Sequence, residues 1–321
     1  MKAIVYRKYG PPDVLELQEV DKPVVKDDEV LVRVCAASVN PLDWHYMRGK
    51  PYLVRAQAGL LRPKRNTLGV DVAGMVEAVG KNVTQFQPGD EVFGGSSGSF
   101  AEYVCAGESS FVLKPANLTF EQAAAVPIAA ITALQALRDK GQIQPGHRVL
   151  INGASGGVGT FAVQIAKSFG AEVTGVCSTR NVDMVRSIGA DQVIDYTRDD
   201  FTQSGQRYDL MLDTVGNRSL SECRRALVTR GFYVSVGAPF GDWIGPLTHI
   251  FKILLVSLVV SQKMAPMLAK LGNKDLVFLK ELIEAGKVTP IIDRRYKLSE
   301  APEAIRYLEE GHAQGKIVIT V

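Results

Sequence analysis

The sequence is poor in the residues that build metal sites and disulfide frameworks. It has four cysteines and four histidines in 321 residues. The cysteines are far apart and include no C-x-x-C pair: Cys35, Cys105, Cys177 and Cys223. This spacing argues against a zinc knuckle and against a disulfide scaffold. We therefore expect reduced thiols and a cytoplasmic location. Because a strand-like segment follows Met1 directly, we expect no signal peptide.

Long hydrophobic runs and a dominant charge are also lacking. Lys and Arg number 37 against 34 Asp and Glu, a net charge of +3. Because the two signs are interspersed, we expect no nucleic-acid partner. The most apolar window, Ile250 to Val260, contains Lys252 and Ser257 and is shorter than the ~20 residues of a transmembrane helix. We expect a buried helix or an oligomer contact there, with peripheral contact to a membrane surface as the alternative.

The composition is that of a globular α/β protein. Hydrophobic residues make up 46% of the chain, charged residues make up 22%, and there are 30 glycines. These proportions exclude a disordered chain. Since 321 residues exceed what one hydrophobic core usually organises, we expect two domains.

The first third of the sequence has short β-rich runs separated by turn signals. The clearest runs are Ala3 to Tyr6, Glu29 to Ala36, Asp71 to Val79, Glu91 to Phe93 and Ala101 to Val104. This rhythm predicts a compact, mostly antiparallel β domain.

After Glu121 the pattern changes to short strands that alternate with helices. The strand candidates are Val149 to Asn152, Glu172 to Val176, Gln192 to Ile194, Leu210 to Asp213 and Phe232 to Val236. Such alternation is typical of a parallel sheet with crossover helices.

The C-terminal segment ends in an apolar strand, Lys316 to Val321, which needs a sheet to join. The economical arrangement returns this tail to the N-terminal β domain and makes the parallel-sheet domain an insertion. We therefore predict one domain from residues 1-122 and 267-321 and a second from residues 123-266.

The run from Val149 to Gly159 has the order strand, glycine turn, helix start. A dinucleotide pyrophosphate binds against N–H groups at the positive end of a helix, where side chains would block its approach. Gly156 and Gly157 permit that approach, and Gly159 lets the helix pack closely on the strand. Because a second strand follows at a suitable distance, the turn predicts a dinucleotide site. The alternative is a purely structural glycine turn.

The end of that second strand bears on the choice between NAD and NADP. A carboxylate at this place binds the ribose hydroxyls of NAD and repels a 2′-phosphate. Here Val176 is followed by Cys177, Ser178, Thr179 and Arg180, none of them acidic. Hydroxyls and a guanidinium bind phosphate through charge-assisted hydrogen bonds. We therefore expect NADPH, and the alternative is that Arg180 is only a surface residue at a helix start.

Several motifs together resemble the medium-chain dehydrogenase/reductase superfamily, and within it the zinc-independent quinone oxidoreductase and enone reductase branch. The similarity covers the whole chain. Besides the glycine turn, the motifs are Ser38 to Trp44, Gly69 to Gly80, Gly89 to Val92 and His312 to Val318. The resemblance implies a Rossmann-type doubly wound parallel sheet inserted into a mostly antiparallel, GroES-like catalytic domain.

The resemblance also implies that catalytic zinc is absent. Asn40, Val70 and Ile128 match the ligand positions of the zinc alcohol dehydrogenases, and none of the three is a usable zinc ligand. We expect no metal. Without a Lewis acid, alcohol oxidation is difficult. Quinones and α,β-unsaturated carbonyls accept hydride directly and need only hydrogen bonds and a proton.

Four residues are candidates for the reacting end of the site. By the resemblance, Asn40 and Asp43 line the nicotinamide pocket and orient the carboxamide or the substrate oxygen. Asn-Pro followed by Asp is, however, also a typical turn. Tyr52 roughly matches a proton-donating tyrosine of related enoyl reductases. His45 is the other candidate proton donor, unless it points to solvent.

A larger set is predicted to bind the cofactor. The resemblance places Tyr196 at the adenosine portion, with a buried aromatic as the alternative. Thr132 is predicted near the nicotinamide, or else packed in a helix, and Lys316 is predicted at a cofactor phosphate, or else solvated. The others lie in the glycine turn or after the strands, where parallel sheets bind ligands: Ala154, Ser155, Gly156, Gly157, Val158, Ser178, Arg180, Val215, Gly216, Ser235, Gly237 and Ala238. Gly237 is equally explained as a turn glycine.

These expectations combine into a reductase that holds NADPH in a cleft between two domains and transfers hydride to a quinone or enone. A non-catalytic, redox-sensing NADPH-binding module stays open as an alternative. An enoyl-thioester reductase of the same fold also stays open, with a basic cleft mouth formed by Arg55, Arg62, Lys64 and Arg65. By the resemblance we expect a homodimer, formed through the segment near Met264 to Leu271.

Overall fold

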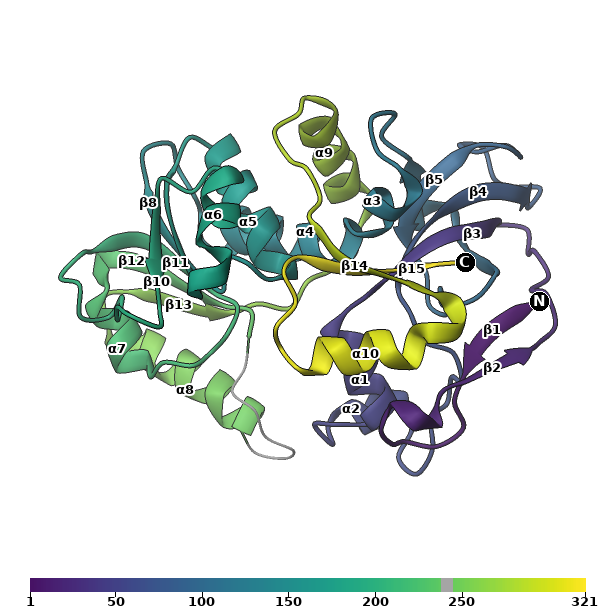
Figure 1. Ribbon diagram of the computed structural model, residues 1–321, viewed down its shortest axis with the longest axis horizontal. Helices are drawn as coiled ribbons and strands as arrows, with labels where there is room; N and C mark the ends of the chain where they lie inside the picture. Colours follow the sequence, from purple (N-terminus) through teal and green to yellow (C-terminus); the bar gives the residue numbers. More distant parts are fainter. Residues whose placement is uncertain (238–244) are drawn as a thin grey trace. The chain divides into compact units, whose positions relative to one another are not determined.

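A computed structural model describes residues 1–237 and 245–321. The described residues form two compact units (Figure 1). The first unit comprises Met1–Ala129, Leu271–Ala285 and Pro290–Val321, and the second comprises Ala130–Lys270 and Gly286–Thr289. The second unit is thus inserted into the first. The domain limits given above, 1-122 with 267-321 and 123-266, stay a prediction.

The first unit is built on a mostly antiparallel sheet with the strand order β14-β15-β3-β4-β5-β7, in which β6 also pairs with β3. The β14–β15 pair is parallel, whereas β3 is antiparallel to β15, β4 and β6. The strands are β3 (Glu29–Val39), β4 (Asp71–Val79), β5 (Glu91–Gly95), β6 (Tyr103–Gly107), β7 (Phe111–Leu113), β14 (Ile292–Lys297) and β15 (Lys316–Thr320). A separate antiparallel pair joins β1 (Lys2–Val5) and β2 (Glu16–Glu19).

Alternating β-branched residues explain the central strand of this sheet. Val30, Val32 and Val34 of β3 are buried in one apolar cluster with Val72 and Val76 of β4, as expected for strands with one face against a core. The strand β15 pairs with the other edge of β3. The predicted return of the tail to the N-terminal sheet is therefore confirmed.

Short helices cover the first unit. They are α1 (Pro41–Arg48), α2 (Val54–Ala58), α3 (Phe120–Ala124), the start of α4 (Pro127–Gln135), α9 (Asn273–Glu284) and α10 (Ala301–Glu309). The helix α10 buries Ala301, Ala304 and Ile305, which lie at helical spacing, in a cluster that includes Met47 of α1. An ion pair between Arg48 and Glu309 also joins α1 to α10.

The second unit contains a parallel sheet with the strand order β10-β9-β8-β11-β12-β13. Its strands are β8 (Arg148–Asn152), β9 (Glu172–Cys177), β10 (Gln192–Asp195), β11 (Tyr208–Asp213), β12 (Leu227–Ser235) and β13 (Lys263–Pro266). Its helices include α5 (Gly157–Ser168), α6 (Val182–Ser187), α7 (Leu220–Arg225) and α8 (Gly245–Val259). This topology confirms the predicted Rossmann-type sheet inserted into a mostly antiparallel domain.

The apolar window near residue 250 is a helix, as predicted, but only one side of it is buried. The helices α7 and α8 lie along the same face of the sheet (Figure 1), and Cys223 and Ile253 belong to one core cluster. On the outer side of α8, Phe251 and Leu255 are each 61% exposed. The expectation of a buried helix is therefore wrong for that side, because the sheet contacts only the other.

Gly159 controls how closely α5 packs on the turn that follows β8. A Cβ at this position would lie 2.0 Å from the carbonyl oxygen of Gly153 and 2.8 Å from Cα of Ala154, and backbone atoms cannot move away cheaply. We expect Gly159→Ala to lower the thermal unfolding midpoint by about 5 °C or more. Gly156→Ala is the matched control, because its nearest contact would be 3.5 Å away. Equal midpoints for the two variants, measured by calorimetry, would contradict this packing role.

Candidate functional site

The turns that follow β8, β9 and β11 meet at the carboxyl edge of the parallel sheet. The N–H of Ala154, after β8, donates to the carbonyl of Val176 in β9 at 3.0 Å. The hydroxyl of Thr214, after β11, donates to the carbonyl of Asn152 at the end of β8 at 2.8 Å. This edge is where open parallel sheets bind ligands.

The glycine turn presents the N-terminal end of α5. The helix begins after Gly156, which has no side chain to cap it, and the first-turn N–H groups of a helix have no helical acceptor. Ser155, Gly157 and Val158 are partly exposed beside them. Backbone N–H groups at the positive end of a helix fit a dinucleotide pyrophosphate.

Ala154 differs from its predicted role. It is completely buried, and its N–H already donates to Val176. Its methyl group faces Gly175 of β9. Ala154 therefore packs the turn against the sheet and is not placed to contact a phosphate.

Asn181 ties the glycine turn to the end of β9. Its side-chain Nδ2 donates to Ser155 Oγ at 2.9 Å and to Ser178 Oγ at 3.3 Å, and the residue is only 4% exposed. Arg180, one residue earlier, is exposed. The sequence reasoning missed Asn181. Its signal was its place directly before α6, where an asparagine suggests a helix cap rather than a link between two turns.

A carboxylate from the neighbouring strand also reaches this region. Asp195, at the end of β10, accepts hydrogen bonds from the Thr179 hydroxyl at 2.6 Å and the Thr197 N–H at 3.0 Å. The Thr179 bond holds the pKa of the Asp195 carboxyl below its usual value. The guanidinium of Arg198 lies 3.5 Å from it, so its charge is locally compensated.

The residue after Asp195, Tyr196, is 52% exposed, so the alternative of a buried aromatic is wrong.

Asp213 fixes the turn after β11. It is fully buried, and its Oδ1 accepts the N–H groups of Val215 at 3.1 Å and Gly216 at 2.9 Å. Its Oδ2 accepts the hydroxyl of Tyr233 at 2.8 Å. Sequence reasoning named Val215 and Gly216 but not the carboxylate that orients them, because an aspartate ending a strand has no distinctive pattern.

Two of the remaining cofactor candidates in the second unit lie beside the turn after β11, and one lies outside the described residues. Ser235 donates its hydroxyl to the carbonyl of Gly237 at 2.7 Å, and the N–H of Gly237 reaches the carbonyl of Asp213 at 3.2 Å. Ala238 lies outside the described residues. Thr132 is 7% exposed within α4, and its place near the nicotinamide stays a prediction.

The first unit contains a buried charged network. Lys316, at the start of β15, is 3% exposed, and its Nζ donates to Asn40 Oδ1 at 2.6 Å and to the Val39 carbonyl at 3.2 Å. Its Nζ also lies 3.5 Å from Oδ2 of Asp71, which is completely buried. Asp71 Oδ2 accepts Asn40 Nδ2 at 2.8 Å, and its Oδ1 accepts the N–H of Ile128 at 2.9 Å.

Asp43 adds a second buried carboxylate to this network. It accepts the N–H of Asn40 at 2.7 Å and the N–H of Gly69 at 3.1 Å. Burial raises the pKa of the Asp43 carboxyl to about 7, and the Asp71 carboxylate acts in the same direction. Burial lowers the pKa of Lys316, and the two carboxylates oppose that shift. One ammonium can balance only one of the two carboxylates, so proton uptake by Asp43 makes the network neutral.

This geometry corrects the prediction for Lys316 and qualifies the predictions for Asn40 and Asp43. The Lys316 ammonium is enclosed by the first unit's own acceptors, so it is neither at a cofactor phosphate nor solvated. Asn40 uses its amide on Lys316 and Asp71, and Asp43 fixes the start of α1. The structure gives both residues a positioning role, and their direct contact with a ligand stays a prediction.

The two proton-donor candidates lie after that helix start and differ in suitability. His45 Nδ1 donates to the Lys50 carbonyl at 2.7 Å, and burial lowers the pKa of the ring. His45 is therefore neutral near pH 7 and has no acidic proton to give. Tyr52 has the Arg55 guanidinium 4.7 Å and the Lys50 ammonium 5.9 Å from its ring centre.

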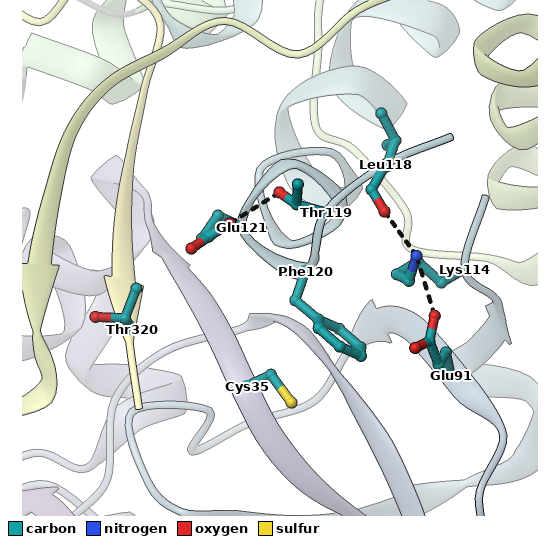
Figure 2. A pocket seen from close by; sticks show the side chains of 8 residues that line it. All are labelled: Cys35, Glu91, Lys114, Leu118, Thr119, Phe120, Glu121 and Thr320. Atoms are coloured by element: carbon teal, nitrogen blue, oxygen red, sulfur yellow. Dashed lines mark hydrogen bonds and ion pairs between the residues drawn. The ribbon is translucent and has the colours of Figure 1, made fainter. Parts of the chain in front are cut away.

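A separate cavity of about 450 Å³ opens in the first unit (Figure 2). None of the predicted site residues that the structure describes lines it. Its polar groups are already engaged, since Lys114 Nζ lies 3.1 Å from a Glu91 oxygen and donates to the Leu118 carbonyl at 2.6 Å. Burial raises the pKa of the Cys35 thiol on its wall. We assign it no part in the site.

Comparison with known proteins decides the family. Residues 26–116 match the family model described as an alcohol dehydrogenase GroES-like domain, and residues 188–319 match the model described as a zinc-binding dehydrogenase. Over the whole chain, the sequence is 36% identical to the mouse protein "NAD(P)H oxidoreductase RTN4IP1, mitochondrial" and spans 89% of it. The chain belongs to the medium-chain dehydrogenase/reductase superfamily. The resemblance seen in the sequence motifs is thereby confirmed.

Two further members of this superfamily are similar to the chain over nearly its whole length. The chain is 34% identical over 99% of its length to the Arabidopsis thaliana "NADPH-dependent alkenal/one oxidoreductase, chloroplastic", of which it covers 79%. The solved quinone oxidoreductase of Coxiella burnetii superposes with a TM-score of 0.89 at 33% identity, covering 100% of this chain and 99% of that one. This chain is therefore a member of an oxidoreductase family.

The comparisons overturn one expectation. The relatives' names place them in mitochondria and chloroplasts, which contradicts the plain cytoplasmic location expected from the cysteine pattern. Reduced thiols are compatible with several compartments, so that pattern was too weak a guide. Within residues 1–237 and 245–321, no helix has the length and apolar character needed to cross a bilayer.

Zinc, named in the description of one matched family model, does not suit the residues present. Asn40, Val70 and Ile128 offer no thiolate, imidazole or carboxylate. The Lys316 ammonium lies within hydrogen-bonding distance of Asn40, and a fixed cation repels a divalent metal. Among the described residues there is also no group of three or more His, Cys, Asp or Glu side chains suited to a metal ion.

The charge balance of this network is testable by unfolding. We expect Lys316→Met to destabilise the protein by about 3–5 kcal/mol, because it leaves buried carboxylates without their cation. Adding Asp71→Asn should recover part of that loss. The measurement is the urea midpoint of each variant followed by circular dichroism. An unchanged midpoint in Lys316→Met would show that the ammonium is not needed for charge balance.

Proposed function

We propose that this chain is an NADPH-dependent, zinc-independent reductase that transfers hydride to a quinone or an α,β-unsaturated carbonyl. The observation that carries the proposal is the Lys316 ammonium, bonded to Asn40 at one of the three positions that match zinc ligands. This arrangement disfavours metal-assisted alcohol chemistry. The named activities of the relatives, an alkenal/one oxidoreductase and a quinone oxidoreductase, support the same substrate class.

In this proposal the second unit holds the cofactor. The N–H groups of Gly157 and Val158 and the Ser155 hydroxyl bind the pyrophosphate. Ser178 and Arg180 bind the 2′-phosphate. When bound, NADPH supplies the hydride. Asn181 and Asp213 do not touch the ligand, and they orient the turns that do.

The first unit supplies the proton and the orientation. Asp43 fixes the start of α1 through the Asn40 N–H, and His45 holds the following loop through the Lys50 carbonyl. That loop carries Tyr52, whose hydroxyl donates the proton that completes reduction of the acceptor. Among the earlier candidates we therefore retain Tyr52 as the donor and make His45 a positioning residue.

We further propose the domain limits 1-122 with 267-321 and 123-266, and a homodimer. Among the described strands, β13 has a paired neighbour on one side only, β12. An unpaired strand edge is a template for pairing with a second copy. The segment Met264 to Leu271, predicted as the dimer contact, overlaps this strand.

The function is tested by following NADPH oxidation with a panel of acceptors: a naphthoquinone, a short enone, a 2-alkenal and a crotonyl thioester. We expect turnover of the quinone, enone or alkenal, unchanged after dialysis against a chelator. Turnover of the thioester alone would make the protein an enoyl-thioester reductase. Tight NADPH binding without any turnover would make it a binding module. Loss of activity on chelation would overturn zinc independence.

Cofactor choice is tested at Arg180. We expect Arg180→Asp to weaken NADPH binding about 10-fold to 100-fold, since one charge-assisted contact is replaced by repulsion. NADH binding should stay nearly constant. Arg186→Asp is the matched control, because Arg186 is also exposed and belongs to the following helix. Fluorescence titration gives both dissociation constants, and equal loss for the two cofactors would sink the assignment.

A further inference from the structure

The outer side of α8 is a continuous apolar stripe. Phe251 and Leu255 are each 61% exposed, Val259 is 83% exposed, and Leu254 is 49% exposed. Phe251, Leu255 and Val259 follow each other at intervals of four residues, so they lie one above the other on one face of the helix. Single exposed apolar residues are ordinary, whereas a contiguous row marks an interaction surface.

The opposite side of α8 is already packed against the core of the second unit. Ile253 is completely buried, and Val256 and Val260 pack against the same core cluster of the second unit. A surface helix that packs on one sheet needs one apolar face. Because α8 has two, its outer stripe is not required for the fold and calls for a partner outside this unit.

The charge around α8 indicates the kind of partner. Between Arg218 and Lys270 the sequence has seven basic and two acidic residues. One of the seven, Arg218, is paired with Asp200, which lies before this segment, so the segment still has an excess of basic residues. Lys252 is exposed on α8 itself. At the carboxyl end of the helix, Arg224 Nε lies 3.3 Å from Gln262 Oε1, and the exposed Lys263 stacks over Phe232 at 5.0 Å.

We propose that the outer face of α8 docks the protein on an anionic lipid surface. The stripe formed by Phe251, Leu254, Leu255 and Val259 enters the boundary between headgroups and acyl chains. Lys252 extends its ammonium to the headgroups. The cations at the end of the helix add electrostatic attraction to acidic lipids.

The charges also explain why a lipid surface is favoured over a second copy of the chain. Two copies that met through this face would share it around a twofold axis. Each Lys252 would then face a surface of like charge, which is unfavourable. An acidic bilayer offers charges of the opposite sign over the whole face.

The proposal is tested by flotation with vesicles of phosphatidylcholine alone or mixed with phosphatidylserine. We expect binding to the acidic vesicles, weakened by salt, and little binding to the neutral ones. The variant Phe251→Ser/Leu255→Ser should bind acidic vesicles at least about 10-fold more weakly. Lys252→Glu should weaken binding by a smaller factor.

The matched control replaces exposed apolar residues elsewhere. Leu60 and Leu61 are 73% and 93% exposed in the first unit, and Leu60→Ser/Leu61→Ser should bind vesicles like the unchanged protein. The thermal midpoints of all variants establish that they are folded. Equal binding by the α8 variant and the unchanged protein, or equal binding to both vesicle types, would overturn the proposal. Loss of self-association in the α8 variant, without any vesicle binding by the unchanged protein, would identify the partner as a second copy.

Discussion

The contact between the Lys316 ammonium and the Asp71 carboxylate is the constraint on which the first unit depends. Both groups are almost completely withdrawn from water, and each buried charge costs several kcal/mol unless it is paired and hydrogen-bonded. The pairing requires β15 to lie beside β3, because only that register brings Lys316 to Asn40 at the end of β3. The same network receives the N–H of Ile128 at the beginning of α4. One ion pair thus fixes strands and a helix from distant parts of the sequence.

The second unit also uses carboxylates to fix its turns. Asp213 and Asp195 both end strands. Their carboxylate oxygens accept hydrogen bonds from backbone N–H or hydroxyl groups of adjacent turns. The groups proposed to contact a ligand are N–H groups, hydroxyls and glycines. The groups that hold them in place are carboxylates and the Asn181 amide. In both units, then, buried polar side chains position the turns that are proposed to contact the ligand.

Sequence patterns predicted the architecture well for a physical reason. Helical and strand periodicity are local, and the glycine turn must have its residues at fixed spacing whatever the rest of the chain does. The return of β15 to the N-terminal sheet followed because an apolar strand must be paired. The limits of single elements were less certain, and β13 was anticipated only as part of a contact segment.

The site was predicted less completely, because partners in a folded network are remote in sequence. No local pattern shows that Lys316 will be enclosed by Asn40 and Asp71 rather than by phosphate. Asp213 and Asn181 were missed for the same reason, since each acts on a turn formed by other residues. The burial of α8 was overestimated because composition reports how apolar a helix is, not how many of its sides meet a core.

The insertion of one unit into the other has a consequence for the order of synthesis. Asn40, Asp43 and Asp71 are made before any residue of the second unit, whereas Lys316 is made after all of it. During translation the carboxylates of the first unit therefore lack the Lys316 ammonium that balances them in the folded structure. The inserted unit is nearly continuous in sequence, so its residues are made one after another with few made elsewhere. The buried charge network of the first unit therefore cannot be completed until the last residues of the chain have been made.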